Sequence, residues 1–427
     1  MALFMARPSL AGTVTILTSF PRELTRAYQL AFEAGHPGIR LQILNKNTVQ
    51  SVAYVRELPA GHRPEVFWAS APDAFELMAR QKLLEKIDDL INKEAPQSAG
   101  PYPINNPEGY YLGQALAGYG LMWNTRYLAA KRLPPPREWA DLARPVYFGH
   151  VAMSSPSRSG STHLTVETLL QGEGWERGWG LLLQIAGNCA AITERSFGVP
   201  EGVNSGQFGI GLVIDFLGLA SRYAGYPVQF AYPEMTAIVP ANIALVAGSR
   251  NPGEARQFIA FTLSRAGQQL LVDPRIARLP ILPPQALTVA PPPGYPDAFQ
   301  MAARAKVRFD PALSGRRYKL VSAMFDQTIT FRLPELQAAT RAIQEGEALL
   351  EGRPDAAAAS LLRQARQLAY APLVDARPAE QTPLEVLFAA GQQPDRATAL
   401  EARWSRQARD HYEQARVMAE QAARLLR

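Results

Sequence analysis

The stretch VYFGHVAMSSPSRSGSTHLTVETLLQ, residues 146–171, joins two kinds of pattern and is central to the interpretation of this chain. Its first part, VYFGHVAMS, is typical of a strand, and its last part, HLTVETLLQ, is typical of a helix that begins just after Gly160. Pro156 ends the strand-like run. The polar segment between them has three interpretations: an ordinary loop, a catalytic serine turn, or a binding loop for an anion.

The start of this helix has the composition of an anion site. The backbone N–H groups of a first helical turn lack carbonyl partners and lie at the positive end of the helix dipole. Ser159, Ser161 and Thr162 add hydroxyl donors, and Gly160 lets the backbone come close to an oxyanion. A helix cap without a ligand is the alternative, because serine and threonine are favoured caps. Three hydroxyls and a glycine exceed what a cap requires, which favours a ligand.

The catalytic interpretations find little support. GSTH at 160–163 lacks the Gly-x-Ser-x-Gly pattern of a nucleophile elbow. GQFGIG at 206–211 leads into a strand-like run instead of following a strand, so we interpret it as a turn. The histidines show no HxxxH or HExxH spacing that would bind zinc. We therefore expect a protein that is not an enzyme and that carries no metal and no cofactor.

The first third of the chain alternates strands and helices. The expected strands are Thr13–Leu17, Ile39–Ile43 and Val66–Ala69, and helices open near Pro21 and Pro72. This alternation predicts a mostly parallel α/β sheet, in which ligands bind beyond the carboxyl ends of the strands. The residues placed at that edge are Thr18, Ser19, Phe20, Lys46, Asn47 and Ser70. Thr48 is expected to cap the intervening helix.

The remainder divides into three parts. A second α/β segment runs from about Gly120 to Tyr232, and a return strand and helix follow it. Pro280–Pro296 is a proline-rich connector. Beyond it the sequence is rich in alanine, glutamine, arginine and leucine and predicts helices. The last begins near Asp395 and carries an apolar stripe that we interpret as a packing seam: Leu400, Trp404, Ala408, Tyr412, Ala415, Ala419 and Ala422.

Composition sets the broad class. With 427 residues, 47% hydrophobic and 19% charged, the chain is long enough for two or three domains. The net charge of +6 comes from basic residues interleaved with acidic ones, which predicts a solvated surface and no nucleic-acid partner. Cys189 is a single cysteine and forms no internal disulfide. No apolar run is long enough to span a bilayer, and MALFMARPSLAG is not an intact secretory signal.

Several motifs together resemble bacterial extracellular solute-binding proteins, the type 2 periplasmic binding proteins of ABC importers. WADLARPVYFGHVAMSSPSRSGST (139–162) is similar to the family's anion-loop region, and GYGLMWNTRYL (118–128) to its crossing strand. The segment 232–271, which begins YPEMTAIVPANIALVAG, is similar to its return strand and helix. The resemblance covers Thr13–Pro284.

This resemblance implies an α/β, two-lobed type 2 periplasmic-binding-protein fold with a helical C-terminal extension. The expected boundaries are 13–114 and 236–285 for lobe 1, 115–235 for lobe 2, 286–299 for the linker and 300–427 for the extension. It also implies a periplasmic protein that binds a solute in a cleft between the lobes and presents it to an ABC transporter permease or a membrane sensor.

Within the family the chain looks closest to the ferric-binding-like branch, which includes hexose-phosphate-binding and phosphoglycerate-transport regulatory proteins. In ferric binders a Ser-Gly-(Ala/Ser) loop holds an anion, a role that carries over to Ser159–Ser161. A tyrosine pair binds iron there, but GIGLVIDFLGL (209–219) has Asp215 and Phe216 instead. ITERSFGVPEGV (192–203) is similar to phosphoglycerate-type proteins and places Arg195 and Ser196 toward the ligand.

A small phosphorylated organic anion is therefore the expected ligand. Asp215 and Glu234 complete the candidate ligand-binding residues. Arg195 is well shaped for bidentate phosphate contacts, although pairing with Glu194 or Glu201 at the surface is the alternative. Two other functions stay open: a ferric-iron and anion binder of the same fold, and an interaction or regulatory protein that acts through its C-terminal helices.

Overall fold

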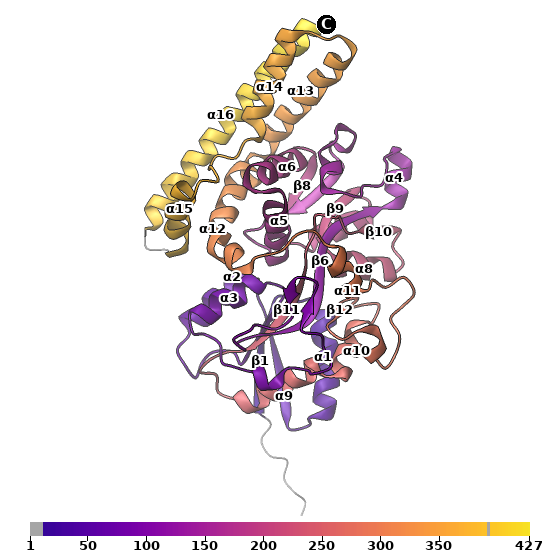
Figure 1. Ribbon diagram of the computed structural model, residues 1–427, viewed down its shortest axis with the longest axis vertical. Helices are drawn as coiled ribbons and strands as arrows, with labels where there is room; N and C mark the ends of the chain where they lie inside the picture. The colour runs from indigo at the N-terminus through magenta and orange to yellow at the C-terminus, as the bar shows by residue number, and fades with distance from the viewer. Residues whose placement is uncertain (1–11, 391–392) are drawn as a thin grey trace, which may run out of the picture. The chain divides into compact units, whose positions relative to one another are not determined.

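The computed structural model describes residues 12–390 and 393–427, and these residues form two compact units (Figure 1). Unit 1 contains the described residues up to Ala117 together with Ile238–Arg304. Unit 2 contains Gly118–Ala237 together with Ala305–Arg427. The C-terminal helices thus fold as one unit with the second α/β segment.

Unit 1 is built on a sheet in which three strands are parallel. Its strands follow the order β2 (Ile39–Asn45), β1 (Gly12–Thr18), β3 (Val66–Ala69), β11 (Ile238–Leu245) and β6 (Leu112–Asn124), and β12 (Leu279–Pro280) pairs with β6. β1 is parallel to both β2 and β3, and β11 is antiparallel to β3. The carboxyl ends of β2, β1 and β3 therefore lie at one edge of the sheet. The three strands predicted from the first third of the chain are therefore parallel, as expected, but the whole sheet of unit 1 is mixed, because the returning strand β11 is antiparallel to β3 and the short strand β12 is antiparallel to β6.

Helices of unit 1 form where the sequence predicts them. α1 (Arg22–Gly35) and α3 (Pro72–Arg80) begin near the two expected prolines. Asn47, not Thr48, caps α2, because the helix already includes position 48 and the side chain before it accepts from the Gln50 amide at 2.9 Å. The other elements are α2 (Thr48–Glu57), α9 (Pro252–Leu263), α10 (Arg265–Leu271), α11 (Ala298–Arg304), two 3-10 turns (Asp88–Leu90 and Pro284–Ala286) and a small hairpin of β4 (Ser98–Ala99) and β5 (Tyr102–Pro103).

An aromatic cluster around Trp68 fills the core of unit 1. The ring centroids of Phe20, Tyr28 and Phe258 lie 5.1, 5.0 and 5.9 Å from that of Trp68, in edge-to-face arrangements that aromatic rings favour. All four side chains are buried. Phe20 is the second residue after the end of β1, so the core extends to the carboxyl edge of the sheet.

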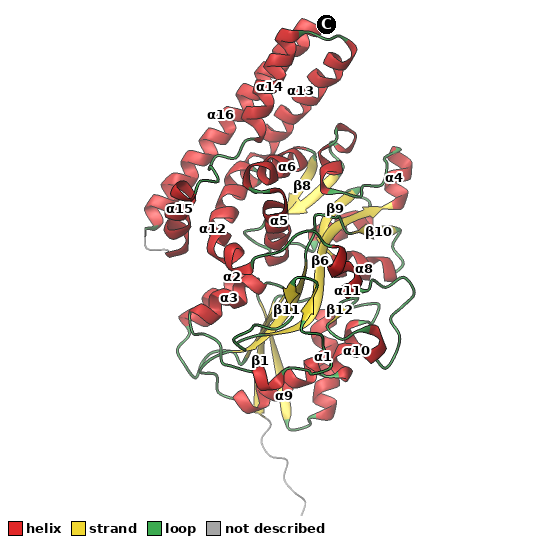
Figure 2. Ribbon diagram, viewed as in Figure 1, coloured by secondary structure: helices red, strands yellow, loops and turns green. Residues whose placement is uncertain are grey.

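The α/β part of unit 2 carries the second half of β6. β6 pairs antiparallel with β9 (Ile210–Ile214) and β10 (Val228–Ala231), and β7 (Val151–Ser154) is parallel to β9 and to β8 (Cys189–Thr193). The helices are α4 (Thr125–Lys131), α5 (Gly160–Glu173), α6 (Trp175–Gly187), α7 (Gly198–Ser205) and α8 (Asp215–Tyr223), with 3-10 turns at Trp139–Ala143 and Pro145–Tyr147 (Figure 2).

The strand predicted from VYFGHVAMS is shorter than expected. Only Val151–Ser154 forms β7, whereas Pro145–Tyr147 is a 3-10 turn. The reason is local: Gly149 has a φ of +77°, a left-handed conformation that interrupts an extended run. The helix predicted to begin just after Gly160 is confirmed, since α5 begins at Gly160 itself.

The C-terminal part of unit 2 is helical, as predicted. It contains α12 (Pro311–Thr328), a 3-10 turn (Thr330–Arg332), α13 (Leu333–Gly352), α14 (Ala356–Tyr370), α15 (Pro378–Ala390) and α16 (Pro394–Leu426). α13, α14 and α16 pack against one another, and α13 also packs on α6 (Figure 2). The predicted seam of α16 is confirmed: Trp404, Ala408, Tyr412, Ala415, Ala419 and Ala422 are buried, and Leu400 is half-buried.

Candidate functional site

Three predicted site segments of unit 2 follow neighbouring parallel strands. The turn at 155–158 follows β7, Glu194–Ser196 follows β8, and Asp215 follows β9. Ser154 and Thr193 are direct partners in the sheet, and the Ser155 amide donates to the Thr193 carbonyl at 3.3 Å. Because the carboxyl ends of parallel strands share an edge, these segments lie at one edge of the unit 2 sheet.

The central segment of this edge is the hydroxyl loop, Ser159–Thr162. Ser159 is the N-cap of α5, and its Oγ accepts from the Thr162 amide at 3.2 Å. The same oxygen lies 3.0 Å from Thr162 Oγ1 and 3.1 Å from Ser161 Oγ, and Ser154 Oγ contacts Thr162 Oγ1. The first turn of a helix leaves its amides without carbonyl partners, so the amides of Gly160 and Ser161 are available here. Ser159, Gly160 and Thr162 are buried and Ser161 is half-buried, so the loop combines a helix cap with the amides of the first turn.

Arg195 lies beside this loop but is directed elsewhere. Its side chain is exposed, and its guanidinium carbon is 5.9 Å from the centroid of the Phe197 ring. Glu194, one of the two partners that the alternative interpretation suggested for Arg195, forms an ion pair with Arg158. Ser196 is half-buried in the same bend. The structure brings this bend next to the hydroxyl loop without a contact from the Arg195 guanidinium.

Asp215 is a buried acceptor at the start of α8. One carboxylate oxygen accepts from the Gly118 amide at 2.7 Å and from the Tyr232 hydroxyl at 3.1 Å, and the other accepts from the Phe216 amide at 2.7 Å. Glu234 has a different environment. Its side chain is 66% exposed and forms an ion pair with Lys306. The two candidate carboxylates therefore do not share one environment.

In unit 1 the predicted edge residues gather around an arginine that sequence reasoning missed. Thr18 Oγ1 accepts from the Phe20 amide at 3.1 Å, and Ser70 Oγ accepts from Arg278 Nη1 at 3.2 Å. The Arg278 guanidinium lies 3.9 Å from the centroid of the Phe20 ring, and Arg278 is only 1% exposed. Ser19 is half-buried beside them. We call Thr18, Ser19, Ser70 and Arg278 the arginine cluster.

A sequence signal for Arg278 exists. It stands in the run IARLPIL (276–282), where one charged side chain is surrounded by apolar ones. Arginine is almost never fully buried unless it is paired, so such a position deserves notice as a candidate for a structural or binding role. The cluster places a positive charge at the carboxyl edge of the unit 1 sheet.

His163, one turn beyond the hydroxyl loop, makes the stability of unit 2 depend on pH. Burial lowers the pKa of His163 to about 4 from the usual 6.5, with Glu167 opposing and Arg317 adding to the shift. Between these values the unfolded chain binds a proton that the folded protein does not, so stability falls as the pH falls from about 6.5 to about 4.

We therefore expect the free energy of unfolding to decrease by roughly 2–3 kcal/mol more in the wild type than in His163→Gln between pH 7 and about 4.5. Urea denaturation at both pH values measures the difference. His62→Gln, at an exposed position, is the control and should follow the wild type. Parallel pH profiles for the wild type and His163→Gln would contradict the prediction.

Side chains that could coordinate a metal ion are not clustered in the described part of the chain. Among residues 12–390 and 393–427, no group of three or more His, Cys, Asp or Glu side chains is arranged to hold a metal ion. At Asp215, which the sequence resemblance aligns with a tyrosine of ferric binders, both carboxylate oxygens already accept hydrogen bonds.

Comparison with known proteins decides the family. Residues 63–296 match the family described as bacterial extracellular solute-binding protein, and the phosphoglycerate transport regulatory protein PgtC of Salmonella typhimurium is 34% identical over 321 residues, which are 74% of this chain and 76% of PgtC. The chain belongs to the extracellular solute-binding proteins. This confirms the resemblance drawn from the sequence motifs.

Solved structures of similar fold are periplasmic binding proteins. AfuA of Actinobacillus pleuropneumoniae, with fructose 6-phosphate bound, has a TM-score of 0.65 at 17% identity, covering 74% of this chain and 98% of AfuA. Iron-bound HitA of Pseudomonas aeruginosa has a TM-score of 0.60 at 18% identity, covering 73% and 98%. The solute-binding protein thus has the predicted two-lobed type 2 periplasmic-binding-protein fold with a helical C-terminal extension.

These findings also set the general function. The family and the structural neighbours are binding proteins, not enzymes, and the fold is that of the solute-binding components of ABC importers. A family described as extracellular places the protein in the periplasm or outside the cell. In the described part of the chain, no helix combines the length and apolar character needed to cross a membrane.

Proposed function

We propose that this solute-binding protein is periplasmic, binds a small phosphorylated organic anion, and presents it to an ABC transporter permease or a membrane sensor. The observation that carries the proposal is the hydroxyl loop: three hydroxyls and the free amides of a helix start gather at the carboxyl edge of β7. PgtC, by its name, takes part in phosphoglycerate transport, and AfuA holds fructose 6-phosphate, which supports a phosphate ester as the ligand class.

The hydroxyl loop would take the phosphate group. The Gly160 and Ser161 amides and the Ser161 hydroxyl supply donors, and α5 contributes the positive end of its dipole. The Thr162 hydroxyl already donates to Ser159 Oγ at 3.0 Å, so it helps to fix the loop. Hydrogen bonds to a charged group contribute roughly 1.5–3 kcal/mol each. Three or four of them, after the cost of ordering the ligand, are compatible with about micromolar affinity, near −8 kcal/mol.

Two arginines would supply the positive charge that attracts the anionic ligand. Arg278 in unit 1 is buried at a strand edge, and Arg195 in unit 2 is exposed beside the hydroxyl loop. Arginine is suited to both carboxylate and phosphate because its planar guanidinium donates two parallel hydrogen bonds. Since the Arg195 guanidinium lies over Phe197, we propose that Arg195 changes rotamer to reach a ligand.

A thermal-shift screen of the wild-type protein tests this function. 3-Phosphoglycerate and fructose 6-phosphate are expected to stabilise the protein, by about 2.7 kcal/mol at a concentration one hundred times the dissociation constant. Glycerate and fructose, which lack the phosphate, are the matched controls and should have little effect. Stabilisation only by Fe(III), with a coloured complex, would favour the ferric alternative, and no stabilisation by any of these compounds would contradict a phosphate-ester ligand.

A further inference from the structure

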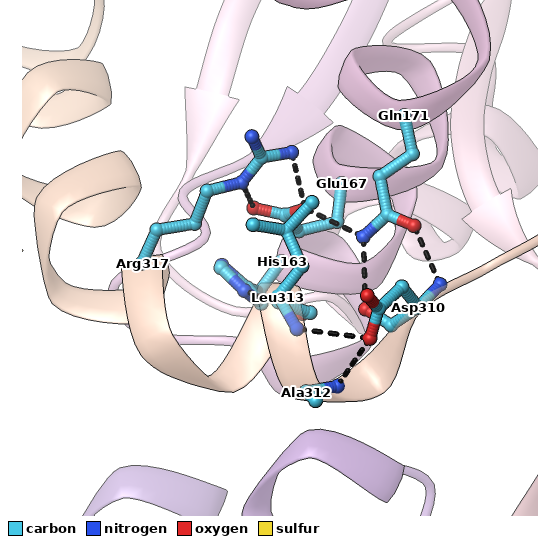
Figure 3. Close-up of polar contacts among 8 residues, drawn as sticks. His163, Glu167, Gln171, Asp310, Ala312, Leu313 and Arg317 are labelled. Atoms are coloured by element: carbon cyan, nitrogen blue, oxygen red, sulfur yellow. Dashed lines mark hydrogen bonds and ion pairs between the residues drawn. The ribbon is translucent and has the colours of Figure 1, made fainter. Parts of the chain in front are cut away.

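Helix α12 of the C-terminal extension packs against α5, and side chains of the two helices meet between them (Figure 3). Near the end of α5, the Asp310 amide donates to Gln171 Oε1 at 2.6 Å, and Gln171 Nε2 donates to the Asp310 carbonyl at 3.1 Å. Nearer the start of α5, the Nε2 atom of His163 lies 3.1 Å from the Ser314 hydroxyl. These contacts join the two helices at both ends of α5.

A buried ion pair fixes the middle of this contact. Arg317 Nε and Nη2 each donate to a different carboxylate oxygen of Glu167 at 2.8 Å, and Gln171 Nε2 donates to Glu167 at 3.0 Å (Figure 3). Glu167 is fully buried and Arg317 is 5% exposed. Such a bidentate pair fixes orientation as well as distance, because both hydrogen bonds need the planar groups to be aligned. α12 and α5 are thus held in one register.

The same helix reaches the turn that precedes the hydroxyl loop. The Ser155 hydroxyl donates to Asp326 Oδ1 at 2.7 Å, and the Tyr318 hydroxyl donates to the Pro156 carbonyl at 3.3 Å. Ser155 is buried, and its Oγ also accepts from the Ser157 amide at 3.3 Å. One side-chain oxygen therefore connects the backbone of the turn to α12.

We propose that Asp326 is a positioning residue for ligand binding, through which the C-terminal extension holds the hydroxyl loop in its anion-binding geometry. The inference deepens the proposed function and rests on it. Asp326 touches no part of the hydroxyl loop itself; it orients Ser155, and Ser155 orients the turn that leads into Ser159. Residues 305–427 lie beyond the family match, which ends at residue 296, so this support comes from outside the matched region.

Asp326 is expected to affect how precisely the donor groups of the hydroxyl loop are positioned, and not how many there are. A site built from backbone amides and short hydroxyls binds well only when its donors are held within about half an ångström of the required positions. Thr330 Oγ1 donates to the same Asp326 oxygen at 2.7 Å, so the carboxylate is itself fixed. Movement of α12 is therefore transmitted to the turn through Ser155, and it changes affinity without changing any group that would touch the ligand.

Two variants and a control test the inference in the full-length protein. Asp326→Ala removes the acceptor, whereas Asp326→Asn keeps an oxygen in its place. Glu347→Ala breaks an ion pair with Arg366 elsewhere in the extension (3.1 Å) and serves as the matched control. The dissociation constant for 3-phosphoglycerate, from titration calorimetry, and amide hydrogen exchange in residues 155–162 without ligand are measured for each.

Asp326→Ala is expected to raise the dissociation constant about tenfold or more and to speed amide exchange in residues 155–162. Asp326→Asn should stay within about threefold of the wild type, and Glu347→Ala should change neither measurement. Unchanged exchange in Asp326→Ala overturns the inference whether or not a ligand is found, as does faster exchange with unchanged affinity. Absence of binding by the wild type would instead contradict the proposed function.

Discussion

Replacing Arg317 with methionine is expected to lower the free energy of unfolding by about 3–5 kcal/mol. The change removes the two Arg317 hydrogen bonds of 2.8 Å to Glu167, which is fully buried, and leaves only that from Gln171 at 3.0 Å. Burial alone raises the pKa of this carboxyl, but the charge and hydrogen bonds of Arg317, together with His163 and Gln171, lower it below its usual value. Without the guanidinium, a buried carboxylate must either stay charged without its partner or take up a proton, and both outcomes cost stability.

The double variant Glu167→Gln with Arg317→Met distinguishes the cost of an unpaired buried charge from the cost of changed side-chain packing. Replacing both members of a buried pair is often much less costly than removing one, so the double variant should recover a large part of the loss. Arg409→Met, in an ion pair with Asp410 whose side chains are 52% and 56% exposed, is the control and should change stability by less than about 0.5 kcal/mol. Urea denaturation at neutral pH measures all of them, and a double variant no more stable than Arg317→Met would contradict the account.

Local patterns in the sequence predicted the elements well because their causes are local. Strand alternation at Ile39–Ile43 and the serine-rich helix start at Ser159 depend on neighbouring residues only, and both are confirmed. The cap of α2 was misplaced by one residue, because Asn47 and Thr48 are both favoured capping types and composition alone does not decide where the first turn begins.

Local patterns do not predict which residues form ion pairs or hydrogen bonds with a buried charged side chain. Glu167 and Arg317 are separated by 150 positions, and Ser70 and Arg278 by 208, so no sequence spacing indicates that they meet. The apolar run IARLPIL indicates that Arg278 is buried, but it does not indicate which residues contact Arg278. The helix start in the hydroxyl loop is confirmed because it depends on one continuous segment, whereas the contact of the preceding turn with α12 depends on packing that only the structure shows.

Replacing Ser159 and Ser161 together with alanine is expected to raise the dissociation constant for 3-phosphoglycerate about a hundredfold. Ser161 would lose a direct hydrogen bond to the phosphate. Ser159 caps α5 and lies 3.1 Å from Ser161 Oγ, so its loss would also disorder the donors around the ligand. Two hydrogen bonds to a charged group, at roughly 1.5 kcal/mol each, correspond to this factor. Titration calorimetry measures it.

A second helix cap provides the comparison that separates a binding loop from a simple cap. Ser264 caps α10 by accepting from the Gly267 amide at 3.2 Å, and it belongs to unit 1, whereas the hydroxyl loop belongs to unit 2. Ser264→Ala should lower stability by about 1 kcal/mol, as the loss of a cap does, and leave the dissociation constant unchanged. If the Ser159→Ala, Ser161→Ala protein behaves in the same way, losing a few degrees of melting temperature but no affinity, then residues 159–162 only begin a helix, and the ligand's phosphate must be held elsewhere.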